Sequence, residues 1–131
     1  MATTITEDYV SFEAAKLLKE KGFDEPCRTY YQDEKFVDDV CTQYYQWNSK
    51  SPFGHISVPT LQMAMKWLKI EHNILLFLLP AQENGKLVYL VEVWTWNEEE
   101  GIYESTYAPM PRKEPEQACE AAIKYCLEHL I

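Results

Sequence analysis

The sequence has little basic charge. Lys and Arg together number 12, against 21 Asp and Glu in 131 residues, which gives a formal net charge of −9 at pH 7. Proteins that bind nucleic acids gain most of their affinity by placing Lys and Arg on phosphates. Because the field of so acidic a chain repels phosphate, we expect no nucleic-acid partner. The acidic charge favours solubility or a basic protein partner instead.

Long apolar runs are also absent. The longest one, Ile74 to Leu79, is far shorter than the roughly 20 residues that a membrane-spanning helix needs. The opening stretch MATTITEDYVSF has no basic segment followed by an apolar one, so it does not have the pattern of a secretion signal. These two observations predict a cytoplasmic protein without a membrane partner.

The sequence lacks the local motifs of cofactor and metal chemistry. Its four glycines are scattered and form no phosphate-binding loop. The histidines lack the spacing that preorganises a metal site, and no two cysteines form a CxxC pair. We therefore expect no cofactor, no metal site and no catalytic residue, with the thiols reduced and half-buried. The residues concerned are His55, His72, His129, Cys27, Cys41, Cys119 and Cys126.

Apolar and aromatic residues are plentiful, at 47% and 14% of the chain. This composition is sufficient for an ordered core, and the length suits one domain over residues 1–131. We divide that domain into an N-terminal helix and hairpin (9–41), an aromatic loop (42–57), and a helix, a three-stranded meander and a closing helix (58–131).

The first part predicts a helix followed by a hairpin. In SFEAAKLLKEKGFDEP, Ser11 can cap a helix whose apolar residues recur at helical spacing. Gly22 suits the left-handed position after the helix, and Phe23 stands where it would contact the last turn. The Tyr-rich stretch that follows predicts a strand at 27–31, a turn at 32–35 and then a second strand.

The third part alternates helical and strand patterns. We expect Ser57 to cap a helix at 59–72 and Asn73 to end it in a left-handed conformation. Asn84-Gly85 is a strong hairpin signal. The remaining elements are strands at 74–79, 86–96 and 102–108 and an amphipathic helix at 115–131.

This order, α-β-β-α-β-β-β-α, predicts an α+β fold in which an antiparallel sheet carries helices mainly on one face. Its second half also follows the chain order of double-stranded-RNA-binding domains. Those domains present a basic cluster on the closing helix, however, and here that helix contains a single lysine, Lys124. The charge therefore disfavours RNA binding.

Three phrases resemble a known group of sequences. With YVSFEAAKLLKEKGFDEPC, PTLQMAMKWLKIEHNI and the hairpin that follows, the chain resembles small uncharacterised proteins of gut Bacteroides, their phages and mobile elements. The likeness covers Tyr9 to Cys27 and Val58 to about Val93. The group has no established activity, so the resemblance implies a setting and a similar fold but no functional residue.

Alternation along residues 86–96 assigns the two faces of the central strand. Val91 and Val93 point toward the helices. We expect Ile74 and Leu76 to lie on the opposite face, at its apolar end.

The other end of that face is the first candidate site. We expect the turn NEEEG to pair Trp96 with Ile102. That register places Glu104 opposite Trp94, on the same face as Glu92. Two tryptophans beside two acids form a surface that can bind a cationic or aromatic partner.

Trp47 and Trp67 complete the candidate residues. The leading hypothesis is a non-enzymatic protein of phage or mobile-element type that binds another protein through the Trp94 and Trp96 surface or through the aromatic loop. A second is an enzyme or small-ligand binder with a pocket between the helix at 59–72 and that loop. A third is a structural homodimer.

Overall fold

The computed structural model describes residues 5–38, 43–107 and 110–131. It confirms the α+β class, and the strands form two antiparallel sheets, ordered β2-β1-β3 and β4-β5-β6. The helices are α1 (Phe12–Glu20), α2 (Trp47–Lys50), α3 (Leu61–His72) and α4 (Pro115–His129), and the strands are β1 (Thr29–Gln32), β2 (Lys35–Asp38), β3 (Ile56–Ser57), β4 (Ile74–Glu83), β5 (Lys86–Asn97) and β6 (Ile102–Tyr107).

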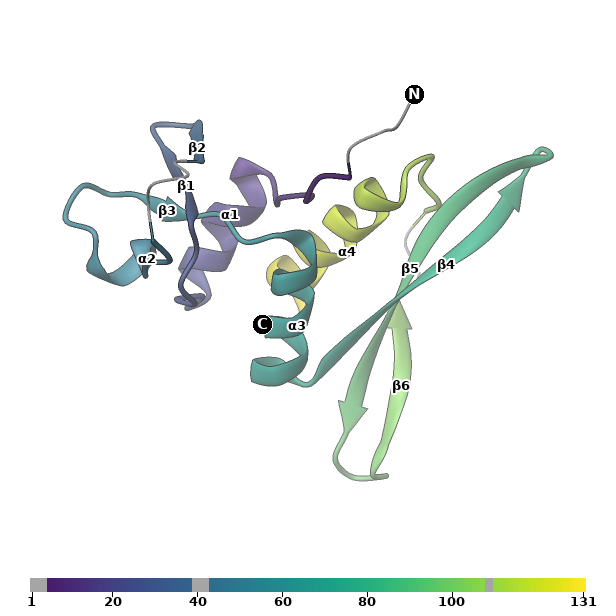
Figure 1. The fold of residues 1–131 in the computed structure, drawn as a ribbon. Helices are drawn as coiled ribbons and strands as arrows, with labels where there is room; N and C mark the ends of the chain where they lie inside the picture. Colours follow the sequence, from purple (N-terminus) through teal and green to yellow (C-terminus); the bar gives the residue numbers. More distant parts are fainter. Residues whose placement is uncertain (1–4, 39–42, 108–109) are drawn as a thin grey trace.

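The longer helices separate the two sheets. Figure 1 shows α1, α3 and α4 in the middle, with the small sheet and α2 on one side and the β4-β5-β6 sheet on the other. The hydrophobic core lies among these helices and includes Leu18 of α1, Leu68 of α3 and Ile123 of α4, together with Val91 of β5. Among the described residues, no helix lies over the opposite face of the β4-β5-β6 sheet (Figure 1).

Both predicted ends of α1 are confirmed. The Ser11 hydroxyl accepts a hydrogen bond from the Ala14 amide at 3.1 Å. At the other end Gly22 has a φ of +95°. The amide of Phe23 donates to the Leu18 carbonyl at 2.9 Å, and the Gly22 amide donates to Lys19. This pair of bonds is a Schellman motif, which satisfies carbonyls that the end of a helix leaves without partners.

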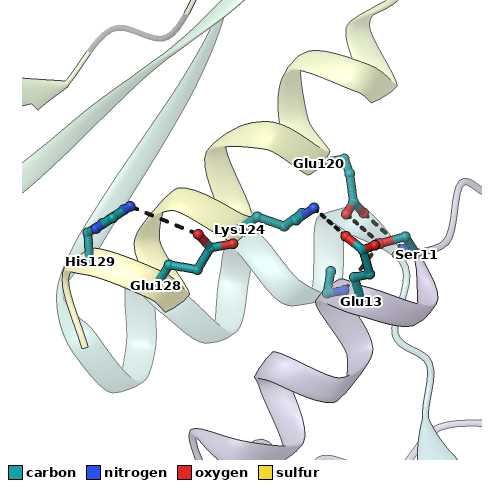
Figure 2. A network of polar contacts seen from close by, with 7 residues as sticks. Ser11, Glu13, Glu120, Lys124, Glu128 and His129 are labelled. Carbon is teal, nitrogen blue, oxygen red and sulfur yellow. Dashed lines mark hydrogen bonds and ion pairs between the residues drawn. The ribbon is translucent and has the colours of Figure 1, made fainter.

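The N-terminus of α1 is also bound by α4. Glu120 accepts hydrogen bonds from the Ser11 amide at 2.9 Å and from the Ser11 hydroxyl at 2.7 Å. In a capping box a Glu within the same helix makes the first of these bonds, and here α4 supplies it instead. One turn further along α4, Lys124 forms an ion pair with Glu13 at 2.7 Å (Figure 2). These contacts fix how α1 docks on α4.

The N-terminus of α3 differs from the prediction. Thr60 caps the helix by accepting from the Met63 amide at 3.1 Å, and Pro59 precedes the cap. The expected cap, Ser57, is wrong, because Ser57 belongs to β3, which pairs with Tyr30 and Tyr31 of β1. The predicted stop is confirmed: Asn73 has left-handed dihedrals, φ 57° and ψ 36°.

The aromatic loop contains two elements that periodicity did not reveal, α2 and β3. The hairpin before it is close to the prediction, with β1 and β2 joined by Asp33 and Glu34, which both have positive φ, as a type I′ turn requires. The predicted end of this hairpin, at 39–41, lies outside the described residues.

The register of β6 corrects the prediction by one residue. Asn97 pairs with Ile102, Trp96 with Tyr103, and Thr95 with Glu104. A bulge between Val93 and Trp94 then resets the pairing. A shift of one residue moves every side chain of a strand to the opposite face, so the predicted position of Glu104 beside Trp94 is wrong.

The faces of β4 also differ from the prediction. Ile74 pairs with Thr95, and Leu76 pairs with Val93, so both lie on the helix face, where Ile74 is buried in the core and the partly buried Leu76 packs against it. Their neighbours Leu75 and Phe77 take the outer face, because side chains alternate along a strand.

Among the described residues no helix is long and apolar enough to cross a membrane.

Candidate binding site: an aromatic pocket on the small sheet

Aromatic side chains gather around Tyr30 of β1. The ring centroid of Trp47 lies 4.2 Å from that of Tyr30, and the centroid of His55 lies 4.5 Å from it. Tyr45 makes an edge contact with Trp47 at 4.9 Å, and Phe53 lies 6.0 Å from His55. The start and the end of the aromatic loop therefore meet on one strand residue.

Hydrogen bonds hold Trp47 in place. Its indole Nε1–H donates to the Cys27 carbonyl at 2.7 Å. Cys27 and Tyr45 also exchange backbone hydrogen bonds, at 2.9 and 3.0 Å. Asn48, the next residue of α2, donates to the Phe23 carbonyl at 2.6 Å and accepts from the Ser57 amide at 2.9 Å. Hydrogen bonds therefore attach α2 both to the segment before β1, through Phe23 and Cys27, and to Ser57 of β3.

His55 is buried and held just as firmly. Its Nδ1 lies 2.8 Å from the Ser51 hydroxyl oxygen, and its backbone carbonyl accepts from the Lys19 ammonium at 3.1 Å. Its ring makes an edge contact with Trp47 at 5.3 Å. His55 therefore forms part of the rigid floor of the site.

Above this floor lies a hollow of about 370 Å³. We call it the aromatic pocket, and it is lined by Tyr44, Tyr45, Trp47, Pro52, Phe53 and His55, with Gln43 and Ser51. Phe53 is 76% exposed and Tyr44 is 67% exposed, so its rim is open to solvent. The volume lies within the range of small-ligand sites, which begins at about 300 Å³.

In the part of the chain that the structure describes, the lining contains no Asp, Glu, Lys or Arg. The faces of aromatic rings carry partial negative charge and attract cations or stack on planar groups. The chain as a whole carries a formal charge of −9. The pocket can therefore hold a guanidinium, an ammonium or an aromatic side chain.

Trp67 is part of the core and not of this pocket. It is only 7% exposed, and its ring meets the edge of Phe23 at 5.5 Å. A separate hollow of about 240 Å³ beside it is lined by Glu25, Pro26 and Met63. Trp47 and Trp67, both proposed from the sequence, thus lie in different places, and only Trp47 contributes to the aromatic pocket.

The tryptophans of β5 form a second surface. Trp96 is 40% exposed and contacts Tyr103 at 5.0 Å, while Trp94 is half-buried and contacts Phe77 at 6.3 Å. Glu92 shares their face by alternation. The structure does not bring Glu104 to them, because it pairs with Thr95 and accepts a hydrogen bond from the Asn97 side chain at 3.2 Å.

The thiols are poorly placed for chemistry. Burial raises the pKa of Cys27 and of Cys126 to about 12. Burial also raises the pKa of Cys119, with smaller effects from Glu116 and Asp8. A thiol must lose its proton to act as a nucleophile, and the raised pKa values keep these three thiols protonated at neutral pH. Cys41 lies outside the described residues.

No group of three or more His, Cys, Asp or Glu side chains within the described ranges is arranged to hold a metal ion.

Sequence reasoning missed Tyr30, the ring on which Trp47 and His55 of the aromatic pocket pack. Alternation along β1 was the available signal, because it turns Tyr30 and Tyr31 to opposite faces. Tyr31 points toward α1, where its hydroxyl donates to the Val10 carbonyl at 3.3 Å and its ring meets Phe12 at 5.2 Å. Tyr30 is left to face the aromatic loop.

Comparison of this chain with protein-family models, with curated proteins and with solved structures finds no match in any of the three.

Proposed function

We propose that this protein is an interaction protein that binds another protein by receiving one of its side chains in the aromatic pocket. One observation carries the proposal: rings of Tyr44 and Phe53 stand open to solvent above a floor that hydrogen bonds hold rigid. Rigid aromatic residues dominate the binding energy of protein interfaces, because they offer a large contact area at little cost in conformational entropy.

The favoured side chain is an arginine. Its planar guanidinium stacks on aromatic rings and is more weakly hydrated than the ammonium of lysine. The contact is worth about 0.5–1 kcal/mol at an exposed site and about 2 kcal/mol when water is excluded. The net charge of −9 adds a long-range attraction for a basic partner, which raises the rate of association.

Two other functions have weaker support. The hollow between α3 and the aromatic loop, lined by Met63, Tyr44 and Cys27, measures about 240 Å³, which is below the usual size of about 300 Å³ for a small-ligand site. The Trp94 and Trp96 surface is an alternative docking face of the same interaction protein. Its support is the exposure of Trp96 and the absence of a helix over that face.

The cytoplasmic location and the phage or mobile-element setting belong to the proposal as well. The phage or mobile-element setting is supported by the resemblance of residues 9–27 and 58–93 to that group.

A peptide selection tests the proposal. Random dodecapeptides displayed on phage are selected against the whole protein, and the affinities of the enriched peptides are measured by fluorescence anisotropy. We expect Arg-containing peptides whose affinity falls about tenfold, or about 1.4 kcal/mol, when Phe53 and Tyr44 are both replaced by Ala.

Ile70→Ala is the matched control, because Ile70 is also a large exposed apolar residue but lies on α3. It should leave the affinities unchanged. Selected peptides that bind the Phe53→Ala/Tyr44→Ala protein as tightly as the original protein would rule out the aromatic pocket. Enrichment of acidic peptides would rule out the proposed preference of the pocket for a cationic side chain.

A further inference from the structure

Among the described residues, the outer edge of β4 has no strand partner along its length. β4 is the edge strand of the β4-β5-β6 sheet, and in the described part of the chain no segment other than β5 pairs with it. An unpaired strand edge is a template on which another strand can form backbone hydrogen bonds. The hydrogen bonds that β5 makes on its side away from β4 show which β4 residues direct their backbone N–H and C=O groups to the free edge.

The hydrogen bonds of Tyr89 in β5 determine which way the backbone groups of β4 point. Tyr89 and Arg112 exchange backbone hydrogen bonds at 2.8 and 2.7 Å, so the backbone groups of Tyr89 point away from β4. In an antiparallel ladder hydrogen-bonded and non-hydrogen-bonded pairs alternate. Pro80, which pairs with Tyr89, therefore directs its backbone groups to the open edge, as do Leu78 and Leu76.

Pro80 limits the part of the edge that can be used. It has no N–H, and an edge strand is the place in a sheet where a proline is tolerated, since its nitrogen then faces away from the ladder. On the side of Pro80 toward α3, the outward donors are the amides of Leu78 and Leu76, and the outward acceptors include the carbonyls of the same two residues. An added strand would centre on these two.

Leu76 and Leu78 also line a groove of about 490 Å³. We call it the edge groove. Leu61 and Met65 of α3 contribute apolar walls, and the N-terminal segment and the start of α4 contribute carboxylates. On the other face of the strand Phe77 is 46% exposed and Leu79 is 37% exposed. A strand added to β4 would therefore contact apolar side chains on both of its faces.

The carboxylates of the edge groove are Glu7, Asp8 and Glu116. Among the described residues none of them forms an ion pair. The pKa of Cys119, which lines the same groove, is raised mainly by burial, and Glu116 and Asp8 add smaller contributions. A ligand with Lys or Arg side chains would supply the missing countercharge.

We propose that the edge of β4 binds an extended segment of a partner protein in which Lys or Arg alternates with apolar residues. The backbone of that segment pairs with Leu76 and Leu78, and its side chains contact the edge groove and its carboxylates. This is strand addition, in which backbone bonds supply affinity and alternate side chains supply specificity.

A second copy of this chain fits the edge less well. Residues 74–82 contain no Lys or Arg, so β4 of another copy brings no charge to balance Glu7, Asp8 and Glu116. It would also bring a second set of these acids and a further net charge of −9. Charge complementarity therefore selects a basic partner.

A pair of synthetic peptides tests this inference. The first is a heptapeptide of alternating Lys and Val, and the second has Glu in place of each Lys. Binding to the whole protein is measured by fluorescence anisotropy, and backbone hydrogen exchange is followed by NMR. We expect the Lys/Val peptide alone to bind, and it should slow exchange at the amides of Leu76 and Leu78.

Two double charge reversals distinguish binding by the carboxylates of the edge groove from a general attraction between the acidic protein and the basic peptide. Glu7→Lys/Glu116→Lys should weaken the Lys/Val peptide about tenfold. Glu98→Lys/Glu99→Lys makes the same change in net charge at the exposed turn between β5 and β6 and should change the affinity less than about twofold. Equal weakening by both pairs, or exchange protection away from β4, would overturn the inference.

Two further measurements complete the test. Sedimentation of the protein without peptide should show a monomer, and a dimer with protected Leu76 and Leu78 amides would assign the edge to a second copy and overturn the inference. Phe53→Ala should leave unchanged the exchange protection that the Lys/Val peptide gives the Leu76 and Leu78 amides, because that protection reports on the edge of β4 and not on the aromatic pocket. The proposal for the edge of β4 and the proposal for the aromatic pocket can therefore be refuted independently of each other.

Discussion

The replacement of Trp67 by Ala tests whether the structure assigns this side chain correctly to the core. Burying a Trp removes about 200 Å² from water, and at roughly 25 cal/mol per Å² that is worth about 5 kcal/mol. Trp67 is 7% exposed and also makes an edge contact with Phe23. Because the Ala side chain keeps part of the burial, we expect a loss of about 3–5 kcal/mol in the free energy of unfolding.

Urea unfolding followed by far-ultraviolet circular dichroism measures this loss without depending on tryptophan fluorescence. Small domains are stable by about 5–15 kcal/mol, so Trp67→Phe, with an expected loss of about 1–2 kcal/mol, is made in case the Ala variant does not fold. Phe53→Ala is the control for an exposed ring and should cost less than about 1 kcal/mol. A Trp67→Ala loss as small as that of Phe53→Ala would refute the assignment to the core.

Other consequences concern the caps, the thiols and one ion pair. Glu120→Ala should lower the free energy of unfolding by about 1–3 kcal/mol, because it leaves the Ser11 amide and hydroxyl without their partner; an unchanged urea midpoint would contradict the role of Glu120. Gly22→Ala should cost about 1 kcal/mol from strain at positive φ alone, since no atom lies within 4 Å of an added Cβ; a loss above about 3 kcal/mol would show a clash instead. In a Cys41→Ser background a disulfide reagent at pH 8 should label Cys27, Cys119 and Cys126 only as fast as the protein unfolds. Burial raises the pKa of Cys27 and Cys126 from the ordinary value of 9.0 to about 12. The contribution of these two thiols to folding stability is therefore fully present below pH 9.0 and is lost as the pH rises from 9.0 to about 12, because only the unfolded protein loses the thiol protons there. The melting temperature should fall above pH 9. The hydrogen bond from Lys124 lowers the pKa of Glu13, so the stability that this pair contributes is present above the ordinary value of 4.5 and is lost as the pH falls below it; Lys124→Gln should reduce the dependence of the melting temperature on acid pH, and Lys113→Gln should not.

The features that the sequence predicted well are local ones. The Schellman motif at Gly22 and Phe23, the stop at Asn73 and the hairpin at Asn84-Gly85 each depend on a few adjacent residues whose backbone preferences dominate. The structure reproduces all three. The α+β class follows from the same elements taken in order.

Features that depend on distant contacts were not predictable. The bulge between Val93 and Trp94 changes the register of β6, and no turn residue signals it. Ser57 and Thr60 are both acceptable helix caps by residue type, and pairing of Ser57 with Tyr30 decides between them. The elements α2 and β3 are only four and two residues long, so they contain too little periodicity to detect.

The candidate site was predicted in part for the same reason. The sequence identified Trp47 as a candidate residue and the aromatic loop around it as a candidate binding surface. It could not reveal that Trp47 packs on Tyr30, because Tyr30 and Trp47 belong to different elements. Trp67 lies on a helix edge by spacing, and it is buried because Phe23 packs against it from outside the helix.

The most direct test of the aromatic pocket compares arginine with its neutral counterpart. A glycine- and serine-flanked arginine peptide and the same peptide with citrulline are titrated into the ¹⁵N-labelled protein, and the Trp47 indole signal is followed by NMR. We predict a saturable shift of this signal with arginine and a much smaller one with citrulline, because only the guanidinium is positively charged and is attracted to the faces of the aromatic rings. Equal shifts with both peptides, or no shift with arginine, would contradict the proposed function.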